Sequence, residues 1–386
     1  MKQQQRTYLD FNATAPLRLE ARQACVAALD LLGNPSSIHA EGRAARGAIE
    51  TARAEVARLA GALAKNVTFT ASGTEAANLA LSPTVGMSGG APIQRLIVSA
   101  GEHACMLKGH RFPAGRVEIA PLTLDGLIDL LALEQMIEKA GGPVMLALQG
   151  ANNETGVIQP VAAAAALVHA ADGIVVCDAV QLAGRVPCHM ADLDADLMIV
   201  SAHKLGGPKG AGALIASPSV IIGSPLVRGG GQERNLRAGT ENVAAIAGFG
   251  AAARAALADR ESEAARLLAL REALETRVRD TAPDAIIFGE SAPRLPNTLY
   301  FAIPGIEAST LVMGLDMAGV AVSSGAACSS GKVTRSAVLD AMGAPGDLAA
   351  GAIRLSLGWS SRPEDIEHFS EALAALVKRI RGHRAA

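Results

Sequence analysis

The sequence predicts an α/β protein with a large domain, built on a mainly parallel sheet flanked by helices, and a smaller α+β domain. Three observations lead to this prediction. Short apolar runs alternate with helical patterns between residues 66 and 216, which is typical of parallel strands joined by crossover helices. Several runs are apolar throughout, as strands covered on both faces are. Beyond residue 241 a long helical pattern is followed by isolated strands.

Six apolar runs are predicted as strands of the large sheet. They span residues 67–70, 95–99, 144–148, 173–177, 197–200 and 212–216. Between them lie helical patterns such as 126–140 and 161–171.

Polar residues follow five of these strands, at 70–73, 102–103, 152–153, 178 and 201–204. Open parallel sheets bind their ligands at the carboxyl ends of the strands. The five strand ends are therefore expected to converge on one site.

The second, smaller domain is expected to follow a bridging helix at 241–280, in which Gly248 and Gly250 are weak points. Its strands are predicted at 297–302 and 353–357. A final helix is indicated by a capping box and one apolar stripe. The capping residues are Ser361 and Glu364, and the stripe is Ile366, Phe369, Leu373, Leu376 and Ile380. We expect the large domain to span 14–259, and the small domain to combine 1–13 with 260–386.

Composition excludes several function classes. The net charge of -2 and the 3% of aromatic residues provide no basic, aromatic-rich surface for nucleic acid. No apolar run is long enough to cross a bilayer, and residues 1–6 do not form a secretion signal. The expectation is a cytoplasmic protein without membrane or nucleic-acid partners.

The five cysteines are odd in number and include no C-x-x-C pair, which argues against a disulfide framework or a structural zinc site. A metal site built from His103, Cys105 and Cys177 is disfavoured because the spacing fits no common ligand pattern. No metal is expected.

A phosphate site is one interpretation of the turn after residues 67–70. The helix that should begin near Thr74 would offer free N–H groups and a favourable dipole to an anion. Gly73 allows close approach of the backbone, and the Thr74 hydroxyl adds a donor. The competing interpretation is an ordinary turn capped by Ser72 or Thr74, because glycine motifs this short often mislead.

Two strand ends carry residues that suit an aromatic, cationic cofactor. Asp178 could cap the next segment or pair with a protonated pyridine nitrogen, and Gln181 could approach a ring hydroxyl. Lys204 follows an apolar strand and precedes a glycine-rich turn. In a closed cleft its amine would lose solvation and its pKa would fall, which allows a Schiff base. Ser201 and His203 flank it and could bind phosphate oxygens.

With these residues in view, the chain resembles the NifS/IscS-type cysteine desulfurases, in the class V aminotransferase group of fold-type I pyridoxal-phosphate (PLP) enzymes. The resemblance covers nearly the whole chain. Its motifs lie at 8–16, 33–39, 152–156, 201–204, 229–240 and 323–331. The last of these, around Cys328, is the most specific.

The resemblance implies a role for each site residue. Lys204 would be joined to PLP, with Asp178 at the pyridine nitrogen and Gln181 and Asn153 near the ring hydroxyl. His103 would stack on the ring and shuttle protons. The phosphate would be held by Gly73, Thr74, Ser201, His203 and, from the other subunit of a homodimer, Thr240. Arg354, helped by Asn34, would bind the carboxylate of L-cysteine.

Cys328 is the expected nucleophile, because Ser, Gly and Ala surround it and favour an exposed loop over a buried, inert thiol. It would receive sulfur as a persulfide and pass it to an acceptor such as an iron–sulfur scaffold protein, for cluster assembly or another route. Ala326 stands where many members of the family have serine, and Ala202 where many have glycine, so both positions keep small residues. The chain stops at Ala386, soon after its last helix, which favours a NifS-like role.

Two alternatives to a cysteine desulfurase stay open on the sequence. The first is another PLP reaction on the same scaffold, such as that of an aminotransferase or a selenocysteine lyase. The second is a non-catalytic sulfur carrier or scaffold. The cysteine segment argues against a simple aminotransferase, and the presence of Lys204, Asp178 and Arg354 argues against a non-catalytic protein.

Overall fold

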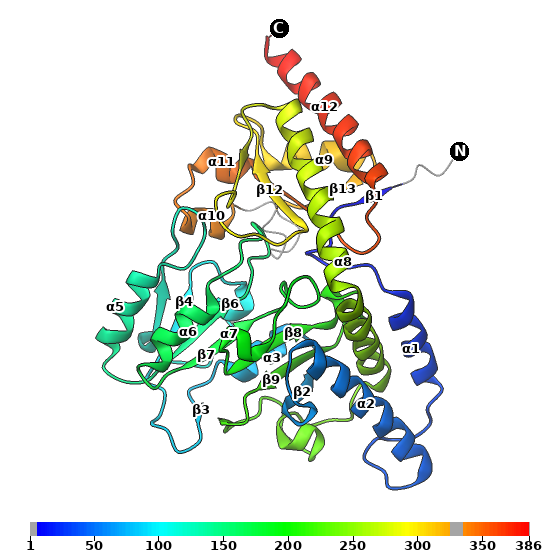
Figure 1. The fold of residues 1–386 in the computed structure, drawn as a ribbon, viewed down its shortest axis with the longest axis vertical. Helices are drawn as coiled ribbons and strands as arrows, with labels where there is room; N and C mark the ends of the chain where they lie inside the picture. Colours follow the sequence, from blue (N-terminus) through cyan, green and yellow to red (C-terminus); the bar gives the residue numbers. More distant parts are fainter. Residues whose placement is uncertain (1–5, 325–334, 386) are drawn as a thin grey trace.

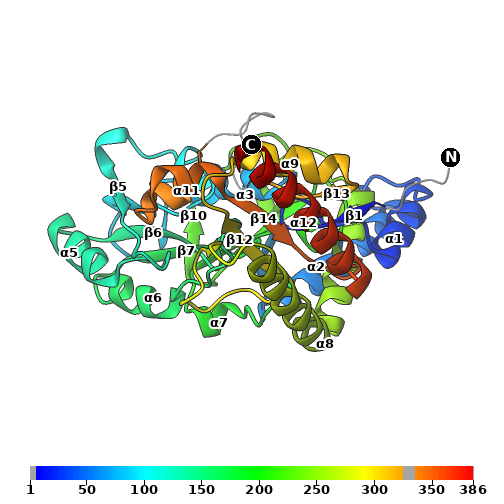
Figure 2. The same cartoon turned by 90° about the horizontal axis from the view of Figure 1, so that it is seen from above.

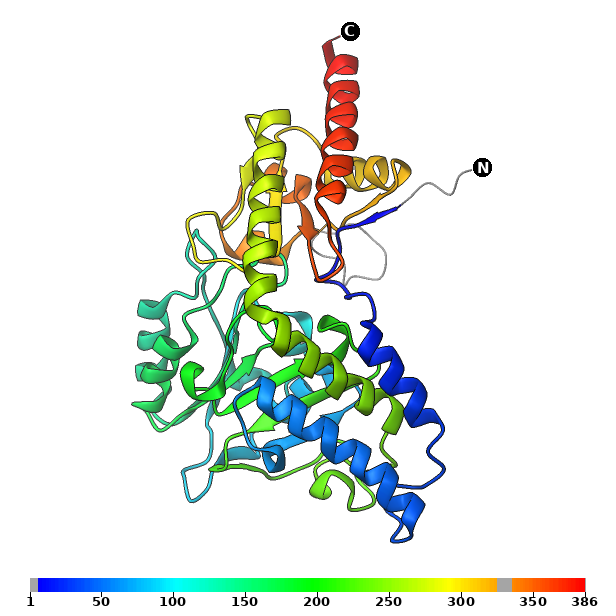
Figure 3. The same ribbon diagram turned by 45° about the vertical axis from the view of Figure 1, so that its right-hand side comes forward.

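The computed structural model describes residues 6–324 and 335–385, which form two bodies stacked along the long axis of the molecule (Figure 1). The lower body contains a seven-stranded sheet, and the upper body a three-stranded antiparallel sheet. The long helix α8 (Val243–Thr281) runs from one body into the other, as Figure 3 shows from a second direction. The predicted α/β fold class is confirmed.

The large sheet has the strand order β2-β9-β8-β7-β6-β4-β5. Its strands are β2 (Val67–Thr70), β4 (Arg95–Ser99), β5 (Val117–Ala120), β6 (Val144–Gln149), β7 (Ile174–Asp178), β8 (Leu197–Ser201) and β9 (Gly212–Ala216). β9 runs antiparallel to both of its neighbours, β2 and β8, and the other pairs of neighbouring strands are parallel. All six predicted strands are present. The edge strand β5 was not predicted because its first three residues are only partly buried or exposed, and Glu118 interrupts its apolar run.

Successive residues of each central strand enter different cores. In β6, Val144 and Leu146 pack into one cluster, and Met145 and Ala147 into another. Helices cover both faces, which explains the uniformly apolar strands. The first cluster includes residues of α2 (Ala40–Leu59), α5 (Leu130–Ala140), α6 (Val161–His169) and the first half of α8. The second includes residues of α3 (Gly73–Ala80) and α4 (Ala104–Leu107).

Two glycines of α8 are positions of close packing rather than weak points. A Cβ at Gly250 would lie 2.4 Å from the Cα of Ala52 in α2. A Cβ at Gly248 would lie 2.3 Å from the Sγ of Cys25 in α1 (Leu19–Leu29). The absence of side chains lets α8 approach both helices, while its second half contacts α12 and β12 in the upper body.

The upper body is built on an antiparallel sheet with the order β11-β12-β14. Its elements are β11 (Ile286–Ile287), β12 (Thr298–Ala302), β14 (Ile353–Ser356), α9 (Ala308–Met317), α10 (Ala337–Ala341), α11 (Gly346–Gly351) and α12 (Pro363–Ala385). The N-terminal β1 (Thr7–Tyr8) pairs with β13 (Val320–Ala321). Seen from above (Figure 2), α5 and α6 lie at one end of the molecule and α1 at the other.

Short elements complete the chain. They are β3 (Val85–Met87), which pairs with β10 (Val220–Ile222), and α7 (Met190–Leu193). Across residues 6–324 and 335–385, no helix combines the length and apolar character needed to cross a membrane.

The capping contact at the start of α12 lies one residue later than the sequence predicted. The Asp365 carboxylate accepts a hydrogen bond from the Arg362 backbone N–H at 2.8 Å, while the Ser361 hydroxyl accepts from Gly358. The predicted pair of Ser361 and Glu364 was therefore wrong, because the helix begins at Pro363. Its apolar stripe is confirmed, since all five side chains pack into the upper core.

Candidate active site

A cavity of about 320 Å³ lies at the carboxyl ends of the central strands and is lined by residues of both bodies. Ten of the predicted site residues line it. They are Gly73, Thr74, His103, Asn153, Asp178, Gln181, Ser201, His203, Lys204 and Arg354. The strand-end argument therefore located a real cavity.

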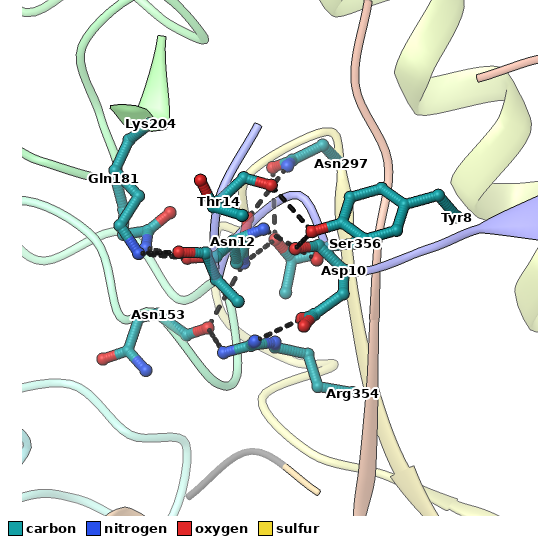
Figure 4. Close-up of polar contacts among 12 residues, drawn as sticks. Tyr8, Asp10, Asn12, Thr14, Asn153, Gln181, Lys204, Asn297, Arg354 and Ser356 are labelled. Atoms are coloured by element: carbon teal, nitrogen blue, oxygen red, sulfur yellow. Dashed lines mark hydrogen bonds and ion pairs between the residues drawn. The ribbon is translucent and has the colours of Figure 1, made fainter. Parts of the chain in front are cut away.

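Lys204 enters the cavity from a short 3-10 turn, Ala202–Lys204, that directly follows β8. Its Nζ donates to the backbone oxygens of Asn12 at 2.5 Å and Ala13 at 2.9 Å (Figure 4). The amine is thus held between the end of a central strand and the N-terminal segment, where it can react with a carbonyl group placed in the cavity.

Asp178 ends β7 and places a buried carboxylate in the cavity. Its Oδ1 accepts from the Val180 N–H at 2.9 Å. Burial raises the pKa of Asp178, and the Val180 hydrogen bond and the nearby His103 and Lys204 only partly oppose that rise. A cation placed against this carboxylate would relieve the cost of desolvation.

The end of the cavity beside α3 suits an anion. Ser72 caps this helix by accepting from the Glu75 N–H at 3.1 Å, so the first turn presents backbone donors and the positive end of the dipole. A Cβ at Gly212, in the adjacent β9, would lie 2.4 Å from the carbonyl carbon of Ser72. Only glycine allows the two backbones to pack this closely.

His203 and Ser201 both line the cavity. Burial, together with Lys204 and Lys209, lowers the pKa of His203 to about 4, so its ring is neutral at pH 7. Its Nδ1 lies 3.3 Å from the Thr14 hydroxyl. A neutral imidazole and the Ser201 hydroxyl can offer hydrogen bonds, rather than charge, to a group in the cavity.

His103 is the N-cap residue of the short helix α4. Its Nδ1 lies 3.2 Å from the backbone nitrogen of Cys105 and 3.0 Å from the Cys105 Sγ. Cys105 itself lines the cavity, and burial raises the pKa of its thiol. The sequence singled out Cys105 only within a disfavoured metal site.

Arg354, on β14, is 2% exposed and extends toward the cavity from the upper body. Its guanidinium donates to the Asn153 backbone oxygen at 2.8 Å and to the Asp10 carboxylate at 2.7 Å (Figure 4). Its Nε is buried and has no hydrogen-bond partner among residues 6–324 and 335–385. A planar donor set oriented in this way can bind a carboxylate.

Asn12 joins the two bodies, and sequence reasoning missed it. Its backbone oxygen accepts from Lys204 and from Gln181 Nε2, while its side chain donates to the Asn153 oxygen and the Thr298 hydroxyl (Figure 4). The sequence indicated Asn12 only through its place in the 8–16 motif, because a residue of any type can accept a hydrogen bond with its backbone oxygen.

Three predicted residues do not line this cavity. Asn34 is exposed, and its Oδ1 accepts from the Ser36 N–H at 2.8 Å. Thr240 lines a separate hollow of about 190 Å³ beside β2. Cys328 lies outside the described residues.

No cluster of three His, Cys, Asp or Glu side chains suited to a metal ion occurs within the described part of the chain. The chemically reactive groups that line the cavity include the Lys204 amine, the Asp178 carboxylate, the imidazoles of His103 and His203 and the Arg354 guanidinium.

Comparisons with known proteins agree with this geometry. The aminotransferase class-V family matches residues 7–369. A cysteine desulfurase of Cereibacter sphaeroides is 41% identical over 98% of this chain and 97% of its own. The cysteine desulfurase IscS of Dictyoglomus turgidum is 36% identical over 97% and 95%. A NifS-like protein of Rickettsia africae superimposes with a TM-score of 0.87 at 33% identity, over 96% and 99%.

The fold and the cavity are those of a PLP-dependent enzyme, and the chain belongs to the aminotransferase class-V family. Within that family, its resemblance to the NifS/IscS-type cysteine desulfurases is confirmed over nearly the whole chain.

The donor set of the cavity fits PLP. The donors at the start of α3 suit its phosphate, and the Lys204 amine suits its aldehyde. The Asp178 carboxylate, whose pKa is raised by burial, suits the protonated ring nitrogen.

Proposed function

We propose that the protein is a cysteine desulfurase, which converts L-cysteine to L-alanine and leaves the sulfur as a persulfide on Cys328. The observation that carries the proposal is the meeting of Lys204, Asp178 and Arg354 in one cavity. Each of these side chains comes from a different strand end or sheet, and each has chemistry that a PLP enzyme acting on an amino acid requires.

PLP, when bound, withdraws electrons from the substrate Cα and so weakens the bonds around it. The chain would hold PLP through Lys204, with Asp178 at the ring nitrogen and Asn153 and Gln181 near the ring hydroxyl. Gly73, Thr74, Ser201 and His203 would hold the phosphate. Arg354 would bind the substrate carboxylate, and the Lys204 amine would take the Cα proton.

The sulfur step balances without an external oxidant. The substrate Cβ–S bond breaks as a new S–S bond forms to Cys328, and a proton replaces sulfur on the carbon. One L-cysteine and one thiol thus give one L-alanine and one persulfide. The persulfide then passes to an acceptor, which we propose to be an iron–sulfur scaffold or another sulfur-accepting protein.

A homodimer is proposed as the working form. Large apolar side chains are exposed along one short segment, a feature that marks protein interfaces. They are Leu17, Leu19, Val26, Leu29, Leu32 and Ile38. Asn34 lies in this segment, and neither it nor Thr240 lines the cavity of its own chain. Both residues would then contribute to the cavity of the other subunit.

We propose the domain division 14–259 against 1–13 and 260–386, and a cytoplasmic location. The support for the division is that Leu9 packs with residues from Leu267 onward, whereas the cores around the large sheet draw on residues 21–256 and Leu295.

The test uses purified protein loaded with PLP. We expect a visible absorbance band, L-alanine formed from L-cysteine, and one added sulfur on the Cys328 peptide by mass spectrometry. Cys328→Ala should keep the band and lose alanine formation, while Cys25→Ala, a cysteine of α1 away from the cavity, should retain both.

Other products would identify the alternative functions. A keto acid would identify an aminotransferase, and a strict demand for selenocysteine would identify a selenocysteine lyase. A colourless protein that remains colourless with added PLP would overturn the proposal.

A further inference from the structure

Cys105 is a residue of the cavity wall that the proposed reaction leaves without a role. It lies two positions after His103 and places two groups against the same ring atom. Its backbone nitrogen is 3.2 Å from His103 Nδ1, and its Sγ is 3.0 Å from that atom. Both contacts come from one residue on the first turn of α4.

The backbone contact assigns the proton on the ring. A peptide N–H can only donate, so His103 Nδ1 must be the acceptor and carry no hydrogen. The proton of the neutral imidazole then belongs to Nε2. Burial raises the pKa of the Cys105 thiol, so this group is also protonated and donates to the same Nδ1.

We propose that Cys105 is a positioning residue that holds His103 as its Nε2–H tautomer, so that the ring offers a donor and not a proton acceptor. This inference rests on the proposed function, because it concerns the role of His103 there. A second proton could enter only at Nδ1, where it would displace the hydrogen bond from the Cys105 backbone N–H and reverse the direction of the contact with the Cys105 Sγ.

Charged groups around His103 oppose this arrangement. Three carboxyl groups interact with its ring, from Glu102 beside it, Asp178 at the end of β7, and Glu154 after β6. Burial raises the pKa of each of the three. A carboxylate here favours the imidazolium form, and the Cys105 backbone N–H opposes that form because it can only donate to Nδ1.

The roles of His103 and Lys204 follow from the hydrogen bonds that occupy His103 Nδ1. A neutral His103 with its only proton on Nε2 cannot take the substrate Cα proton. That task belongs to the Lys204 amine, while His103 donates a hydrogen bond into the cavity. A neutral ring also avoids placing a second positive charge beside a cationic cofactor.

The direct test is nitrogen NMR of protein labelled with ¹⁵N-histidine, with and without PLP. The His103 signals are assigned by difference with His103→Asn. We expect an unprotonated Nδ1 and a protonated Nε2 at pH 7 in both samples. A protonated Nδ1 in either sample would overturn the proposal, and this readout does not depend on turnover.

The pH dependence of kcat/KM in Cys105 variants tests the contribution of the thiol separately from that of the backbone N–H, which every variant keeps. Cys105→Ala removes one donor, so imidazolium forms more readily and the acid limb of kcat/KM for alanine release should move up by about half a pH unit or more. Cys105→Ser restores a donor and should return the limb toward its original position. Cys25→Ala is the matched control and should leave it unmoved.

The outcomes distinguish the two proposals. Absence of alanine formation by the unmodified enzyme would refute the desulfurase activity itself. Alanine formation with the same acid limb in Cys105→Ala and the unmodified enzyme would refute the role of the thiol alone. A shift in Cys105→Ala that Cys105→Ser does not reverse would indicate a packing effect and would also refute it.

Discussion

Two buried carboxylate sites of this chain differ in how far nearby cations offset the cost of burying the carboxylate. In the first, Glu233 receives both Arg53 nitrogens at 2.7 and 2.9 Å and the Phe69 N–H at 2.9 Å. In the second, Asp178 and Glu102 are buried together beside the cavity, and the pKa of each is raised. We call the first site saturated, because hydrogen bonds and an opposite charge satisfy its carboxylate within the chain. We call the second site unsaturated, because its carboxyl groups keep a cost of burial that a cationic ligand could relieve.

The saturated pair fixes a strained turn. Burial lowers the pKa of Arg53, but its hydrogen bonds and charge interaction with Glu233 outweigh this and raise it. Glu233, Arg234 and Asn235 all have positive φ angles, at 45°, 55° and 67°. Three such residues in succession persist only where surrounding contacts hold them, and the Arg53 fork supplies those contacts.

The largest expected effect is on activity, from Asp178→Asn. Removing the charge that we propose lies at the ring nitrogen should lower kcat for alanine formation about 10²–10³-fold. The free energy of unfolding of the cofactor-free protein at pH 7 should not fall, because the cost of burying this carboxylate outweighs the attraction of His103 and Lys204. Urea unfolding and an alanine assay measure the two effects.

Asp30→Asn, at an exposed position after α1, is the control for Asp178→Asn and should change neither quantity. A marked loss of stability in Asp178→Asn would mean that Asp178 is saturated like Glu233, and the contrast between the two sites would fail.

The next largest effect is on stability, from Glu233→Gln. This change leaves the buried Arg53 guanidinium with only the half-exposed Glu50 as a counter-charge, which should cost about 3–5 kcal/mol of unfolding free energy. Urea unfolding measures it. Glu50→Gln is a matched control on the same arginine, because Glu50 is half exposed and its contact is 3.2 Å. It should cost under about 1 kcal/mol.

Equal losses in the Glu233 and Glu50 variants would show that burial does not set the strength of the Arg53 contacts. The double variant Arg53→Met, Glu233→Met should recover part of the loss, since it leaves no unpaired charge.

The sequence could predict the cavity floor because parallel strands place their carboxyl ends at one edge of the sheet. Asp178 and Lys204 were found in this way, from apolar runs that stop at a polar residue. The upper wall was not predictable from such runs. The contacts of Arg354 with Asp10 and with the Asn153 backbone depend on how the N-terminal segment passes between the bodies.

Predictions from short sequence patterns were wrong or missing where contacts between distant segments determine the structure. The capping box at Ser361 fitted the residue types, yet the chain turns one residue later. Gly248 and Gly250 lower helix propensity, but their lack of side chains allows α8 to pack closely against α1 and α2. Glu233 lay in a motif that carried the family resemblance, but no pattern linked it to Arg53, 180 residues earlier.

The smallest expected effect is a pH dependence that belongs to the unsaturated site. Glu102 accepts from the Gln149 N–H at 2.5 Å, while its other carboxyl oxygen is buried without a hydrogen-bond partner in the described chain. Burial first, and then the charge of Asp178, raise its pKa well above the ordinary value of 4.5. The folded state therefore binds a proton that the unfolded state releases.

Stability must fall as pH rises from the ordinary pKa through the raised one, and level off above it. Glu102→Gln removes this penalty, so the stability of the cofactor-free variant relative to the unmodified protein should increase with pH and be greatest above the raised pKa. Urea unfolding at a series of pH values between 4 and 9 measures it. Adding Asp178→Asn should narrow the pH range over which stability falls, because the charge of Asp178 is one of the causes of the raised pKa of Glu102. A difference that stays constant across the series would show that Glu102 is as well neutralised as Glu233.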